Sequence, residues 1–141
     1  MREEFRKRLA EEYRYAVTKM QEAKDPAKKL FYFSVLFGNA QRILNWEWNR
    51  DLVLIHAVTY HVHTQVNTTM QTPGGQIFPI DWANIFKKLT QVTNDLATYF
   101  EKAENKDNQE ELCEILGCFA EISYAVSGNG SYLHEKGSFI L

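Results

Sequence analysis

The residues best suited to chemistry lie around the start of one predicted helix, where Arg50 and Asp51 precede His56. A guanidinium can bind a phosphate group through two hydrogen bonds, and an imidazole can take up or release a proton near neutral pH. Asp51 would orient the pair. Arg50 falls in the first helical turn, where the helix dipole disfavours a cation and the free backbone N–H groups attract an anion. The pattern therefore indicates a site for a phosphate-containing ligand.

Arg50-Asp51-x4-His56 resembles the Arg-polar-x4-His signature of HEPN domains, all-α domains found in prokaryotic ribonucleases and toxin modules. The preceding segment, 28–44, also resembles the helix before that signature, because aromatic residues are followed by aliphatic ones. The resemblance implies a metal-independent endoribonuclease or nucleotide-binding module, with RNA as partner. Arg50 and His56 would line a cleft between two protomers, and His56 would move a proton to or from the ribose hydroxyl. Unlike the family pattern, two predicted helices follow the motif here.

A second interpretation of the same residues is structural. Arg50 could form an ion pair with Glu47 or Asp51 at the helix entrance, and His56 could lie in the core. The sequence alone leaves both interpretations open, so whether the protein is an enzyme stays undecided at this stage. No nucleophile elbow or paired-carboxylate pattern offers another catalytic arrangement.

His56, Tyr60, His63 and Asn67 fall on one side of the same helix and form a candidate ligand or interface strip. His56 and His63 are separated by about 10.5 Å along the helix axis, too far to share a metal ion bound at about 2.0–2.1 Å. We therefore expect no metal and no cofactor. The strip is compatible with hydrogen-bonded core imidazoles, with a pH-sensitive interface, or with contacts to a small apolar ligand.

Hydrophobic periodicity and capping residues predict an all-α fold: a single bundle of about five helices spanning 1–141. The first helix covers 3–23. Asp25-Pro26 starts the second, which reaches Trp46, and Asn49 caps the third, which reaches Met70. After a turn at 72–75, Asp81 caps the fourth helix, and a polar loop at 105–108 precedes the fifth. The apolar end of segment 131–141 predicts a docked or swapped tail.

The central helix lies within residues 52–80, which contain no Lys, Arg, Asp or Glu. A helix exposed to water usually carries charge on its outer side. We therefore expect this one to be enclosed, by its own fold, by another copy or by a partner, with the charge-free segment 30–41 as its main neighbour. Together with an aromatic content of 13%, this favours a protein that acts as a homodimer or as a subunit of a larger assembly.

Composition gives broader limits. The formal net charge is −2 at pH 7, without a long run of like charges, so no nucleic-acid arm or acidic tail is indicated. We expect no secretory signal, because the start is charged, and no membrane span, because the charge-free segment is rich in Thr, Gln, Asn and His. Cys113 and Cys118 have neither disulfide nor metal spacing and are expected to be buried thiols. We expect a cytoplasmic protein.

Overall fold

The computed structural model describes residues 1–72, 80–102 and 108–126, and every regular element in these ranges is a helix. The predicted all-α class is confirmed. The helices are α1 (Glu3–Glu22), α2 (Pro26–Phe33), α3 (Val35–Leu44), α4 (Arg50–Gln71), α5 (Trp82–Glu101) and α6 (Gln109–Val126). Most of the predicted turn at 72–75 and all of the predicted tail at 131–141 lie outside the described residues.

Three helix starts follow from capping residues. The side chains of Asp25, Asn49 and Asp81 each accept a hydrogen bond from a backbone N–H in the first turn of α2, α4 and α5, at 3.0–3.2 Å. Each carboxylate or amide oxygen thereby satisfies a donor that has no partner within its helix. The predicted starts of these helices are confirmed.

The second predicted helix is interrupted, which the sequence pattern did not indicate. α2 ends at Phe33, α3 begins at Val35, and α3 stops at Leu44 rather than at Trp46. Between them, the Ser34 hydroxyl donates to the carbonyl of Phe31. A serine hydroxyl that bonds back to its own helix competes with the backbone pattern and bends the chain.

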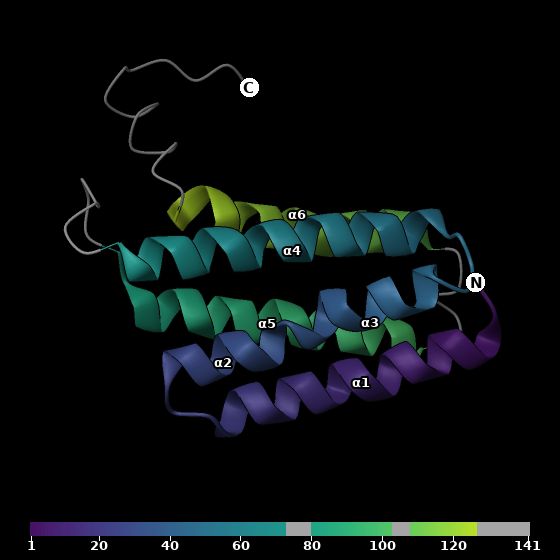
Figure 1. Cartoon of the computed structure of the whole chain (residues 1–141), viewed down its shortest axis with the longest axis horizontal. Helices are drawn as coiled ribbons and strands as arrows, with labels where there is room; N and C mark the ends of the chain where they lie inside the picture. The colour runs from purple at the N-terminus through teal and green to yellow at the C-terminus, as the bar shows by residue number, and fades with distance from the viewer. Residues whose placement is uncertain (73–79, 103–107, 127–141) are drawn as a thin grey trace, which may run out of the picture.

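The helices form a closed bundle whose order in space differs from their order in sequence (Figure 1). α1 packs against α5 on one side and against α2 and α3 on the other. α4 packs against α3 and α6, and α6 packs against α4 and α5. The charge-free segment 30–41, which covers the end of α2 and most of α3, is thus a main neighbour of α4, as predicted. α4 and α6 run in the same direction, since Arg50 meets Gln109 at one end and Thr69 meets Val126 at the other.

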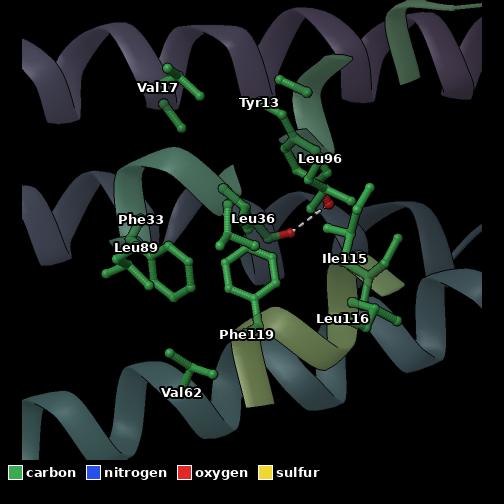
Figure 2. Packing of buried hydrophobic residues seen from close by; sticks show 14 of the residues in the cluster. Tyr13, Val17, Phe33, Leu36, Val62, Leu89, Leu96, Ile115, Leu116 and Phe119 are labelled. Carbon is green, nitrogen blue, oxygen red and sulfur yellow. Dashed lines mark hydrogen bonds between the residues drawn. The ribbon is translucent and has the colours of Figure 1, made fainter. Parts of the chain in front are cut away.

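The core lies where all these helices meet (Figure 2). Phe119 of α6 and Phe33 of α2 are fully buried, and their ring centroids are 5.7 Å apart. Tyr13 of α1 is also fully buried, and its hydroxyl donates to the carbonyl of Leu36 at 2.9 Å. Burial of the phenol raises the pKa of Tyr13 well above its ordinary value. This hydrogen bond ties α1 to the start of α3.

On the surface, α1 and α5 are joined by an ion pair. The Arg14 guanidinium donates to both carboxylate oxygens of Glu101, at 2.6 and 3.1 Å. This hydrogen-bonded partner lowers the pKa of Glu101. Within the described residues, no helix is long and apolar enough to cross a membrane.

Candidate functional site

Arg50 is exposed at the start of α4, and its guanidinium lacks the carboxylate partner that the structural interpretation required. Its Nη2 atom donates to Oε1 of Gln109 at 3.5 Å, a long hydrogen bond, and no ion pair to Arg50 exists within the described residues. Glu47 instead lies 3.2 Å from the Arg2 guanidinium and 3.5 Å from the N-terminal amine. The predicted pairing of Arg50 with Glu47 or Asp51 is therefore wrong.

Arg50 and His56 do not converge within one chain. They are about 9 Å apart along the axis of α4 and differ in direction by about 120°. Arg50 reaches toward α6, whereas His56 packs against Phe37 of α3. Asp51, which is partly exposed, follows Arg50 in the first turn of α4. A joint action of Arg50 and His56 would need the two residues to come from different copies of the chain.

Three residues of the predicted strip do come together. The rings of His56 and Tyr60 are stacked with centroids 5.8 Å apart, and Phe37 lies edge-on to His56, Tyr60 and His63 at 5.2–6.2 Å. His63 also stacks on Phe33 at 6.5 Å. Burial lowers the pKa of His63. These ring contacts fix His56 and His63 between α3 and α4.

Asn67 lies on the same helix but outside this aromatic cluster. Its side-chain oxygen accepts a hydrogen bond from Gln71 at 2.9 Å. The contribution of α3 to the cluster was not identified from the sequence. The sequence signal for it is the aromatic, charge-free segment 30–41, which predicts a neighbour of α4 but does not single out Phe37.

Both cysteines are exposed, so their predicted burial is wrong. Cys113 and Cys118 lie on α6, which has solvent on its outer side. Partial burial raises the pKa of Cys118, and the nearby carboxylates of Glu121, Asp95 and Glu114 act in the same direction. The thiolate of Cys118 is therefore disfavoured. Within the part of the chain that the structure describes, no three His, Cys, Asp or Glu residues are placed to hold a metal ion.

The outward side of α4 is exposed, so the prediction that its own fold encloses this helix is wrong. The exposed residues after the first turn are all uncharged: Ala57, Tyr60, His61, Thr64, Thr68 and Gln71. The polar side chains among them form hydrogen bonds with water, so this side of the helix can be exposed to solvent without charged residues. Enclosure by a second copy or by a partner is the part of the prediction that stays open.

An uncharged stripe of α6 continues this surface. Cys113, Gly117, Ala120 and Tyr124 are all exposed and recur at helical spacing. The acidic side of α6, with Glu121, lines a groove toward α5, so the uncharged stripe lies on the side of α6 next to α4. We call the exposed residues of this combined surface the α4/α6 face: Ala57, His61, Thr64, Thr68, Cys113, Gly117, Ala120 and Tyr124.

The comparisons with known proteins add no relative. No protein family model, curated protein or solved structure matches this chain. The interpretation of the site therefore depends on the geometry described above.

Proposed function

We propose that the protein acts by self-association, in which two copies bind each other through the α4/α6 face. The observation that carries this proposal is the lack of charge along one stripe of each of two neighbouring helices, in a chain of which 24% of residues are charged; the exposed glutamates of α6 lie beside the stripe and not in it. Depletion of charge at the centre of a patch is the compositional mark of a protein interface. A symmetric dimer needs one self-complementary patch, and an uncharged patch faces its own copy without repulsion.

The size of the face supports a reversible dimer. An 18-residue helix is about 27 Å long, and two adjacent helices are about 20 Å wide, so the footprint is about 540 Å² per copy. Two copies would bury about 1,100 Å², close to the lower limit for a biological interface. We therefore expect an equilibrium between monomer and dimer at micromolar concentration.

Sedimentation equilibrium tests this proposal, with a dimer expected at twice the 16.5 kDa mass of the chain. Ala120→Lys places an unpaired charge in the α4/α6 face and should lower dimer affinity at least about 100-fold. Ala125→Lys is the matched control, because Ala125 is also an exposed alanine of α6 but lines the groove toward α5. It should leave the dimer intact.

Two results would contradict the proposal. One is a monomer at all concentrations. The other is a dimer that survives Ala120→Lys, which would locate the interface elsewhere, for example at the exposed Trp46 and Trp48.

A second candidate function is metal-independent RNA cleavage of the HEPN type, and the lack of a carboxylate partner for Arg50 favours it. An exposed guanidinium at a helix start, paired with no acid in the described residues, is available for a phosphate. In a dimer, His56 of the second copy would transfer the proton. Cleavage of single-stranded RNA in EDTA tests the activity, with Arg50→Ala and His56→Ala expected to abolish it. Arg42→Ala, which removes an exposed arginine of α3, is the control. Cleavage that persists in both site variants would exclude this function.

A further inference from the structure

A cleft of about 680 Å³ opens between α1, α2 and α5, away from the α4/α6 face. Its volume lies within the range of small-molecule sites. The lining combines aromatic, amide and hydroxyl groups with three lysines, Lys24, Lys29 and Lys87, and none of its described residues is Asp or Glu. Such a concentration of one sign of charge is unexpected in a protein whose net charge is −2.

The three lysines are available to a ligand. None of them forms an ion pair within the described residues. Lys29 is held in place because its Nζ atom donates to the carbonyl of Met20 at 2.6 Å, and an ammonium group retains further donors. Four carboxylates are adjacent in sequence to the lining, and each is engaged or directed elsewhere. Asp25 and Asp81 cap helices, Glu22 pairs with Lys19, and Asp95 lines the groove toward α6. The cleft therefore has positive potential that no carboxylate of its own lining neutralises.

The cleft also has an aromatic wall. Trp82 is half-buried and Phe86 is buried, with ring centroids 6.3 Å apart. Asn94 also lines the cleft, and its side-chain oxygen accepts a hydrogen bond from Arg14, which leaves its amide N–H groups as donors. Aromatic surface and anion-binding groups thus lie in one cavity.

We propose that this cleft binds a small organic anion, in which a phosphate or carboxylate is joined to a flat aromatic group. The aromatic group packs on Trp82 and Phe86, and the anionic group is held by Lys29 and Lys87. This site is independent of self-association and of the Arg50 region.

Isothermal titration calorimetry tests the proposal with adenosine 5′-monophosphate and 1-naphthoate as probes. At least one of these aromatic anions should bind, and which one binds distinguishes phosphate from carboxylate recognition. Adenosine lacks the anionic group and inorganic phosphate lacks the aromatic group. Adenosine loses a hydrogen bond to a charged group, and inorganic phosphate loses the aromatic contact, so each should bind at least about tenfold more weakly.

Two neighbouring lysines of α5 provide a matched pair of variants. Lys87→Gln should weaken binding about tenfold, whereas Lys88→Gln should not change it, because Lys88 lines the other groove, toward α6. The proposal is overturned if neither aromatic anion binds at millimolar concentration, if adenosine binds as tightly as its monophosphate, or if inorganic phosphate binds as tightly as either aromatic anion. It is also overturned if the two lysine variants have equal effects.

Discussion

Gly117 in the middle of α6 allows a sharp test of the α4/α6 face. A Cβ atom built at this position meets no heavy atom within 4 Å, so nothing else in the described chain requires a glycine there. Glycine in a helix interior costs about 0.5–1 kcal/mol relative to alanine. Gly117→Ala should therefore raise the free energy of unfolding of the single subunit by about 0.5–1 kcal/mol, and its Tm by about 3 °C.

The same substitution should weaken the dimer. If two copies bind through this face, the added methyl group lies in the interface. It would separate the facing helices of the two copies, which can approach more closely when residue 117 is glycine. Overpacking of this kind costs about 1–3 kcal/mol, and we expect dimer affinity to fall about tenfold. Gly117→Ala thus should stabilise the subunit and loosen the assembly at the same time.

Gly38 of α3 provides the control, because an added Cβ atom there also meets open space. Gly38→Ala should stabilise the subunit equally and leave dimer affinity unchanged. Urea unfolding at low protein concentration measures the first quantity, and sedimentation equilibrium measures the second. Our reasoning is refuted if Gly117→Ala dimerises as tightly as the unmodified protein, or if both variants loosen the dimer equally.

Three further predictions concern the core. Phe119→Ala should reduce the free energy of unfolding by about 3–5 kcal/mol in urea titrations. Phe31→Ala, at a ring that is 66% exposed, should change it by less than about 0.5 kcal/mol. Similar losses for the two variants would contradict the packing described. Tyr13→Phe removes the hydrogen bond to Leu36 and should cost about 1 kcal/mol, measured in the same titration; an unchanged stability would contradict that bond. Burial lowers the pKa of His63 in the folded chain. As the pH falls below about 6.5, His63 is therefore protonated in the unfolded chain before it is protonated in the folded chain, and the free energy of unfolding should decrease as the pH falls. His63→Phe should reduce this loss in thermal unfolding followed between pH 7.5 and 5.5, and an undiminished pH dependence would assign it to other groups.

Much of the fold could be predicted because its signals are local. Asp25, Asn49 and Asp81 act within one helical turn, so their sequence context is enough to place a helix start. The break at Ser34 was missed because serine is compatible with a continuous helix. Only the position of its hydroxyl, directed at the carbonyl of Phe31, indicates the bend.

The candidate site was harder to predict because it depends on which helices are neighbours. The spacing of His56, Tyr60 and His63 placed them correctly on one side of α4, but their partner Phe37 comes from another helix. Likewise, the lack of charged residues in segment 52–80 distinguishes α4 from an ordinary surface helix, but it does not show which side of α4 faces solvent. The cleft between α1, α2 and α5 left no sequence motif, since its lysines come from segments about 60 residues apart in sequence and meet only after packing.

The position of α6 between α4 and α5 has a consequence for synthesis of the protein. Ribosomes add residues from the N-terminus, so α1 to α5 emerge before the helix that separates α4 from α5 and supplies Phe119 to the core. Until residues 109–126 have left the exit tunnel, the apolar sides of α4 and α5 that α6 covers stay open to solvent. Closure of the core therefore waits for α6, and the apolar sides of α4 and α5 are the surfaces that stay unburied until it has emerged.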